Sequence, residues 1–96
     1  MYIINITYKV PLETVDHYLE SHVAYLNEQY KQGYFLASGR KVPRTGGIII
    51  SNVSDKLELT AIIEKDPFKM NDLADYELIE FIPSKTNEVL SFLLDQ

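Results

Sequence analysis

The sequence has 96 residues, 46% of them hydrophobic and 24% charged, which predicts one globular domain over residues 1–96 and disfavours disorder. Its 14 acidic and 9 basic residues give a net charge of -5, which disfavours nucleic acid and anionic membranes as partners. The chain lacks cysteine, a signal-peptide pattern at its N-terminus and any apolar run near the roughly 20 residues of a membrane span, so we expect a cytoplasmic protein without thiolate chemistry.

The first half of the chain predicts a strand, a long helical segment and a second strand. β-Branched and aromatic residues dominate Tyr2–Tyr8, which is typical of a strand. Leu12–Gln32 has apolar residues at helical spacing: Leu12, Val15, Leu19, Val23, Leu26 and Tyr30. A break near His17 would divide this segment into two helices, and Gly33 is expected to end it in the left-handed conformation. Tyr34–Ser38 is the predicted second strand.

The second half predicts two further strands and two helices. Ile48–Val53 is the third strand, and the glycines and proline of residues 39–47 indicate a loop or a long hairpin connection before it. Ser54 or Asp55 can cap a helix that runs to about Lys65, with an inner face of Leu57, Ala61 and Ile62. A short turn, DPFKMND, leads to a fourth strand at Tyr76–Ile82. A final helix is expected from Ser84 to Leu94, with Val89, Leu90, Leu93 and Leu94 available for packing.

This order of elements, β-α-β-β-α-β with a closing helix, is the α+β ferredoxin-like pattern, a four-stranded antiparallel sheet with its helices on one face. The third strand carries Ile48, Ile49 and Ile50, so apolar side chains point to both faces of the sheet. The helices cover only one face, and the other would expose a larger apolar patch than soluble monomers usually show. We therefore predict a homodimer in which the open sheet faces of two copies pack together.

Two residues are candidates for acid–base chemistry, and each also has a purely structural interpretation. On the helical wheel His17 lies opposite the apolar stripe and is expected to be exposed, whereas His22 lies at the edge of the stripe. Partial burial beside a carboxylate can bring proton exchange by an imidazole near neutral pH, but a helix-edge histidine with an ordinary hydrogen bond is the more frequent case. Asp66, followed by Pro67, favours a helix start in which the carboxylate accepts a backbone N–H. No spacing rule connects His22 with Asp66.

The segment 38-SGRKVPRTGG-47 concentrates three of the nine basic residues. Glycine-rich backbone with nearby arginine can bind a carboxylate, a phosphate or an enolate, which makes Ser38, Gly39, Arg40 and Arg44 candidates for binding a small-molecule ligand. A solvated hairpin loop is the alternative interpretation, and it fits Lys41 best. The spacing is not that of a phosphate-binding P-loop. No His/Asp/Glu group has the spacing of metal ligands, so we expect no metal site.

The motifs 22-HVAYL-26, VPRTGG and DPF, in this order and spacing, resemble the YciI-like (YCII-related) domain family from Tyr2 to about Phe81. The resemblance implies the fold of the dimeric α/β-barrel superfamily, in which two sheets pack face to face. It also implies that a histidine and an aspartate, here His22 and Asp66, meet as a catalytic pair. The chain departs from the family pattern at Arg40, because proline often follows the Ser-Gly pair there.

The resemblance implies enzymes that act on small molecules, although most family members have no assigned reaction. One member type eliminates chloride from a chlorinated hydroxyquinol, and relatives in the superfamily isomerise muconolactone. We therefore expect a lyase or isomerase without metal or organic cofactor, in which His22 exchanges a proton with a small cyclic or unsaturated metabolite. The alternatives are a module that binds a small ligand without transforming it, and a purely structural dimerisation domain.

Overall fold

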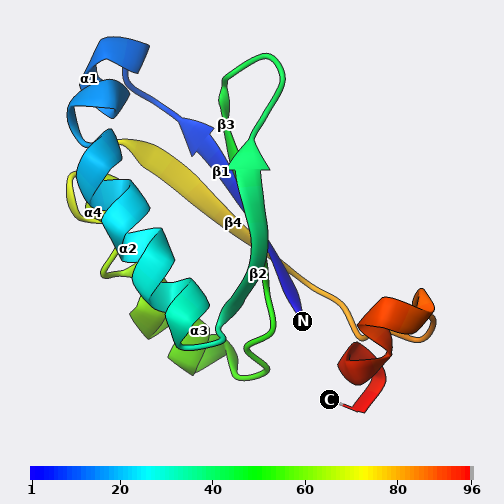
Figure 1. Cartoon of the computed structure of the whole chain (residues 1–96). Coiled ribbons are helices and arrows are strands. Elements are labelled where there is room, and N and C mark those ends of the chain that lie inside the picture. The colour runs from blue at the N-terminus through cyan, green and yellow to red at the C-terminus, as the bar shows by residue number, and fades with distance from the viewer. Residues whose placement is uncertain (96) are drawn as a thin grey trace.

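A four-stranded antiparallel sheet with helices α1 to α4 on one face forms the body of the molecule, as a computed structural model that describes residues 1–95 shows (Figure 1). The strand order is β2-β3-β1-β4, and every neighbouring pair is antiparallel. The elements are β1 (Tyr2–Tyr8), α1 (Leu12–His17), α2 (Leu19–Lys31), β2 (Phe35–Arg40), β3 (Gly46–Ser51), α3 (Lys56–Ile63), α4 (Pro67–Met70), β4 (Ala74–Glu80) and the 3₁₀ helix η1 (Glu88–Asp95). The predicted α+β ferredoxin-like fold is confirmed.

The long helical segment consists of two helices that meet at Tyr18. The backbone there has φ -104° and ψ 4°, outside the helical region, so the break falls one residue after His17. Gly33 follows α2 with φ 79°, the left-handed conformation that glycine adopts without steric cost. Both features agree with the sequence-based prediction.

Strands β2 and β3 extend into the segment that the sequence predicts as a loop. β2 runs to Arg40 and β3 begins at Gly46, so residues 41–45 form the connection in place of residues 39–47. The predicted loop is too long because glycine usually interrupts a strand, whereas Gly46 is required within this one. A Cβ at this position would lie 1.8 Å from the carbonyl oxygen of Ile6 on the neighbouring strand. The missing side chain lets β1 and β3 approach each other.

Helix α3 packs on the sheet through a different face from the predicted one. Its buried residues are Leu59, Ile62 and Ile63. Of the predicted inner face, Ile62 is buried but Leu57 is 81% exposed and Ala61 is exposed as well. Both sets have helical spacing, so periodicity alone does not choose between them. Asp55 sets the start of the helix, because its side chain accepts a hydrogen bond from the Leu57 N–H at 3.0 Å.

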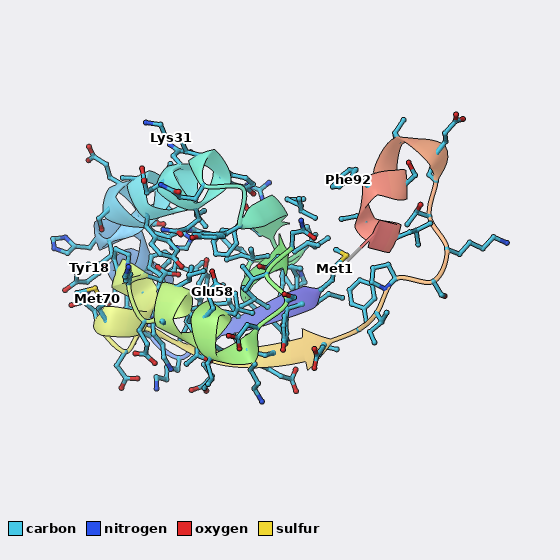
Figure 2. The ribbon with its side chains drawn as sticks, turned by 90° about the horizontal axis from the view of Figure 1, so that it is seen from below. Met1, Tyr18, Lys31, Glu58, Met70 and Phe92 are labelled. Atoms are coloured by element: carbon cyan, nitrogen blue, oxygen red, sulfur yellow. The ribbon has the colours of Figure 1, made fainter. Side chains whose placement is uncertain are left out.

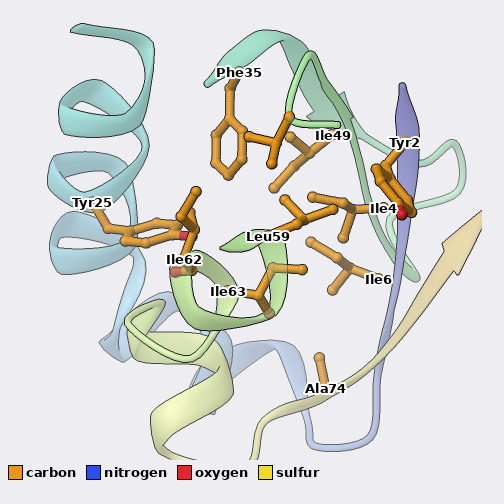
Figure 3. Close-up of a cluster of buried hydrophobic side chains, with 11 residues drawn as sticks. Tyr2, Ile4, Ile6, Tyr25, Phe35, Ile49, Leu59, Ile62, Ile63 and Ala74 are labelled. Carbon is orange, nitrogen blue, oxygen red and sulfur yellow. Dashed lines mark hydrogen bonds between the residues drawn. The ribbon is translucent and has the colours of Figure 1, made fainter. Parts of the chain in front are cut away.

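The main hydrophobic core lies between the sheet and helices α2 and α3 (Figure 3). Its buried side chains include Tyr2, Ile4, Ile6, Tyr25, Phe35, Ile49, Leu59, Ile62 and Ile63. A second, smaller cluster joins Val15 of α1 to Phe68 of α4 and to Leu73. This second cluster holds α4 against α1, and α4 is the helix that begins after Asp66.

The C-terminal region departs most from the sequence-based prediction. β4 ends at Glu80, two residues earlier than predicted, so Ile82 lies beyond the strand and is exposed. The predicted α-helix from Ser84 to Leu94 is instead η1, which stands apart from the body (Figure 2). Of its four predicted packing residues, Leu93 is buried, whereas Val89, Leu90 and Leu94 are exposed. Leu90 and Leu93 line a cavity together with Ala37 and Ile50, so this segment borders the open face of the sheet rather than the face that α2 and α3 cover.

We expect Gly46→Ala to destabilise the fold by about 1–3 kcal/mol, the usual cost of forcing extra atoms into close packing. The reason is the collision of the new Cβ with the Ile6 carbonyl. Gly39→Ala is the matched control, because a Cβ there meets no atom within 4 Å. Urea unfolding of both variants measures the effect, and equal stability of the two variants would contradict the close approach.

Candidate active site

A pocket of about 390 Å³ lies on the helix-bearing side of the sheet, between α2 and the β2–β3 hairpin. Helix α2 lines it with Leu19, His22, Val23 and Leu26, and strand β2 with Ser38, Gly39 and Arg40. Arg44 from the hairpin connection and Phe68 from α4 line the pocket as well. All five pocket candidates from the sequence, His22, Ser38, Gly39, Arg40 and Arg44, therefore line one cavity.

His22 projects from the first turns of α2 and is 9% exposed. Its Nδ1 lies 2.8 Å from Oδ1 of Asp66, so the predicted pairing of the two residues is present. The imidazole stacks on the Phe68 ring with centroids 3.8 Å apart and an angle of 2° between the planes. Tyr25 lies on α2 with its ring 6.3 Å from that of His22, at 27°. These contacts hold the imidazole ring in one plane.

Asp66 lies behind His22, away from the pocket, and is only 1% exposed. Its carboxylate accepts three hydrogen bonds. Oδ1 accepts from the Phe68 N–H at 3.0 Å as well as from His22, and Oδ2 accepts from the Tyr76 hydroxyl at 2.5 Å. The same side chain therefore caps α4 and contacts the imidazole. A buried carboxylate is tolerated when its oxygens are hydrogen-bonded in this way.

The hydrogen bonds determine which nitrogen of His22 carries the proton in the neutral ring. An ionised carboxylate only accepts hydrogen bonds, so Nδ1 must donate to Asp66. Nε2 is then the unprotonated nitrogen. Within residues 1–95, Nε2 has no hydrogen-bond partner. It is also not one of the fully buried polar atoms without a partner, so it is in contact with solvent. The arrangement leaves one basic nitrogen of His22 accessible at the pocket.

Two tyrosines keep the surroundings of Asp66 uncharged. Burial, followed by the negative charge of Asp66, raises the pKa of the Tyr25 hydroxyl well above its usual value, and that hydroxyl donates to the Ile62 carbonyl at 2.9 Å. Burial and the Asp66 charge raise the pKa of Tyr76 further still. Tyr76 therefore remains a protonated donor to Asp66 at any physiological pH.

The polar residues of the hairpin have different surroundings. The Ser38 hydroxyl lies 2.5 Å from the Tyr30 hydroxyl, and Nη2 of Arg44 lies 2.5 Å from Oδ1 of Asp16 on α1. Arg40 makes no ion pair with any residue that the structure describes. Lys41 donates from Nζ to the Thr7 hydroxyl at 3.1 Å and does not line this pocket.

Sequence reasoning missed several residues of the site. On the apolar stripe of α2, Leu19 and Val23 are exposed and line the pocket. The buried side of α2 is formed by His22, Tyr25 and Gln29. The composition of this buried side could have indicated the site, because it has a histidine and a tyrosine where a core-facing helix usually has aliphatic residues. The contact of Tyr76 with Asp66 could not be predicted, because nothing in the neighbouring sequence indicates a carboxylate partner.

No group of three histidine or acidic side chains within residues 1–95 is arranged to hold a metal ion. In the same part of the chain, no helix combines the length and apolar character needed to span a bilayer.

The fold and the pocket define a class: a ferredoxin-like α+β domain with a buried histidine–carboxylate pair beside a cavity on the helix-bearing side of the sheet. The family model for the YCII-related domain matches residues 1–82. The chain belongs to this family. Residues 83–96, which include η1, lie outside the matched region.

A solved structure with the same fold is the 5-chloro-2-hydroxyhydroquinone dehydrochlorinase from Burkholderia phenoliruptrix in complex with 2,5-dihydroxybenzoquinone. The TM-score is 0.70 at 18% sequence identity, and the match covers 84% of this chain and 93% of that one. At this identity the likeness concerns the fold alone. Comparison with curated proteins found no significant match.

The raised pKa values of Tyr25 and Tyr76 predict a loss of stability at alkaline pH. Above about pH 10 the unfolded chain releases these protons while the folded chain keeps them, so the free energy of unfolding falls by up to about 1.4 kcal/mol per pH unit for each tyrosine. Urea unfolding between pH 9 and pH 11 (roughly the range around the ordinary tyrosine pKa) measures the slope. Tyr25→Phe and Tyr76→Phe should each make it shallower, and an unchanged slope in both variants would contradict the assignment.

Proposed function

We propose that the chain is an enzyme without metal or organic cofactor, a lyase or isomerase that moves a proton on a small cyclic or unsaturated metabolite. The observation that carries the proposal is the buried contact between His22 Nδ1 and Asp66 Oδ1, with Nε2 accessible at the pocket. A nitrogen base that is oriented by a carboxylate and lies beside a cavity is the usual arrangement for general acid–base catalysis. The fold shared with a dehydrochlorinase adds support by analogy.

In the proposed reaction Nε2 of His22 removes a proton from a carbon or hydroxyl of the substrate. The electron pair of the broken bond forms a new double bond. In an isomerisation the electrons of a neighbouring double bond shift to another substrate atom, and in an elimination a leaving group departs with its electrons. Asp66 stabilises the imidazolium ion and keeps the ring in place. The imidazolium then returns the proton to another substrate atom in an isomerisation, or to water in an elimination.

The hairpin supplies the groups proposed to hold the substrate. Ser38, Gly39, Arg40 and Arg44 line the cavity opposite α2. The arginines can bind an oxygen that becomes negatively charged as the proton leaves, which lowers the barrier to its removal. The Ser38 hydroxyl, already in contact with Tyr30, can donate to the same oxygen.

We further propose that two copies pack through the open face of the sheet. The register places Ala37, Ile50, Ile3 and Ile79 in one row across all four strands. Ile3 alternates with the core residues Tyr2 and Ile4, so the row lies on the face opposite the helices. Ile79 is 45% exposed, and Phe81 beyond it is exposed too. An apolar row of this extent on one side of a small protein is better buried than hydrated. A homodimer would bury it in both copies.

Replacing His22 by alanine should lower kcat/KM by about 10²–10⁴-fold, the usual contribution of a positioned acid–base group. A turnover assay with 5-chloro-2-hydroxyhydroquinone and a panel of unsaturated lactones provides the measurement. His17→Ala is the matched control, because His17 is an exposed histidine on the neighbouring helix. Circular dichroism verifies that the variants fold. Full activity of His22→Ala would remove the proposal, and ligand binding without turnover in the unmodified protein would favour a non-catalytic binding module.

Ile79→Asp should convert the dimer into a monomer, because the substitution places a charge within the proposed interface. Leu57→Asp introduces the same charge at an exposed position on the opposite side of the molecule and should leave the dimer intact. Light scattering at micromolar concentration distinguishes the two states. A monomeric unmodified protein would contradict the proposed packing.

A further inference from the structure

The charges around the pocket differ from those of the chain as a whole. The chain has 14 acidic and 9 basic residues, yet two arginines and His22 line the pocket, and none of the aspartates and glutamates that the structure describes does. Asp66 is sealed behind His22 and its oxygens are occupied by three donors. A cavity with positive groups and no acidic side chain in its wall attracts an anion even when the protein is acidic overall.

Arg44 is held at the edge of this pocket by an ion pair with Asp16, and the Tyr8 hydroxyl lies near it as well. One of its terminal nitrogens lies 2.5 Å from a carboxylate oxygen of Asp16, on α1. Asp16 does not line the pocket, and its side chain is 52% exposed, against 30% for Arg44. An ion pair this exposed contributes little to stability. The guanidinium has five N–H donors in total, so most of them are free for another acceptor.

Arg40 reaches the same cavity from the end of β2. It pairs in register with Gly47, which has no side chain to compete for the space beside it. Among the residues that the structure describes, no carboxylate forms an ion pair with Arg40. Facing the two arginines, Leu19, Val23 and Leu26 form an apolar wall on α2. The cavity therefore has a cationic side and an apolar side.

We propose that the pocket selects a small unsaturated or aromatic carboxylate. While the pocket is empty, Asp16 pairs with Arg44 in place of the ligand carboxylate. Binding transfers Arg44 from Asp16 to the ligand, whose carboxylate lies between Arg44 and Arg40. The apolar body of the ligand lies against α2, near His22. Planar guanidinium groups bind carboxylates through paired hydrogen bonds, which gives orientation as well as affinity. Asp16 is thus a specificity-determining residue outside the pocket wall, and the inference names the substrate class for the function proposed above.

The test compares two ligands of the same shape and different charge, benzoate and benzamide. Their dissociation constants are measured at low ionic strength from amide NMR shifts of residues 38–47. We expect benzoate to bind at least about tenfold more tightly than benzamide, and Arg44→Gln to abolish most of this preference. Asp16→Asn should tighten benzoate binding by about threefold to fivefold, the scale of an exposed ion pair, and leave benzamide unchanged.

The control for Asp16→Asn is Asp72→Asn, which removes one negative charge and an exposed ion pair with Lys9 outside the pocket. Asp72 has φ 55°, a conformation that asparagine also adopts readily. If Asp72→Asn tightens benzoate binding as much as Asp16→Asn does, the effect is one of net charge and the role of Asp16 is overturned. Equal affinity for benzoate and benzamide overturns the choice of an anion. Tighter binding of inorganic phosphate than of benzoate overturns the choice of a carboxylate.

These outcomes are separate from those that test catalysis. His22→Ala should lose turnover and keep the preference for benzoate, because the arginines remain. A protein that prefers benzoate but turns over no substrate would refute the proposed reaction and leave the carboxylate selectivity standing. A protein that turns over neutral substrates without preferring benzoate would refute the selectivity alone.

Discussion

The buried carboxylate of Asp66 is the interaction on which the arrangement of the site depends. A charge in the interior is costly unless donors surround it, and here the three donors come from three different elements: α2, α4 and β4. The requirement for hydrogen bonds therefore fixes the positions of two helices relative to the sheet. An apolar side chain in place of Asp66 would satisfy none of these donors, so the carboxylate organises local structure whether or not it takes part in chemistry.

The same carboxylate explains why a helix cap and a candidate catalytic group coincide in one residue. Pro67 starts α4 and has no N–H, so the first free N–H of that helix belongs to Phe68. Capping this group turns the Asp66 side chain back toward the sheet and toward α2. Phe68 then lies directly against the imidazole of His22. A four-residue helix thus supplies both the orientation of the carboxylate and the surface on which the histidine packs.

Much of the fold could be predicted because alternation, helical spacing and glycine positions are local signals. β1 has the predicted bounds, the break after His17 is where two helices were considered, and Gly33 has the expected conformation. The pairing of His22 with Asp66 came from a family resemblance, since no local rule connects residues so distant in sequence. Leu57 and Leu59 show the limit of periodicity, because both fit a helical stripe and only tertiary packing decides which is buried.

The contacts between Arg44 and Asp16 and between Tyr76 and Asp66 could not be predicted, because each joins elements whose relative position depends on the whole fold. The C-terminal segment shows a related limit. Its sequence has a helical pattern, yet the segment forms the 3₁₀ helix η1, in which most of the apolar side chains stay exposed. Local propensity is a weak constraint when tertiary contacts are missing.

The parallel stacking of His22 on Phe68 has a stereochemical consequence. The imidazole packs on the Phe68 ring and its Nδ1 is hydrogen-bonded to Asp66, so the ring cannot flip within the site. Its accessible nitrogen therefore approaches a flat ligand from one direction only. In the proposed reaction, a trigonal carbon of a ligand bound in one orientation would receive its proton on the same face in every turnover, and a new chiral centre would form with a single handedness.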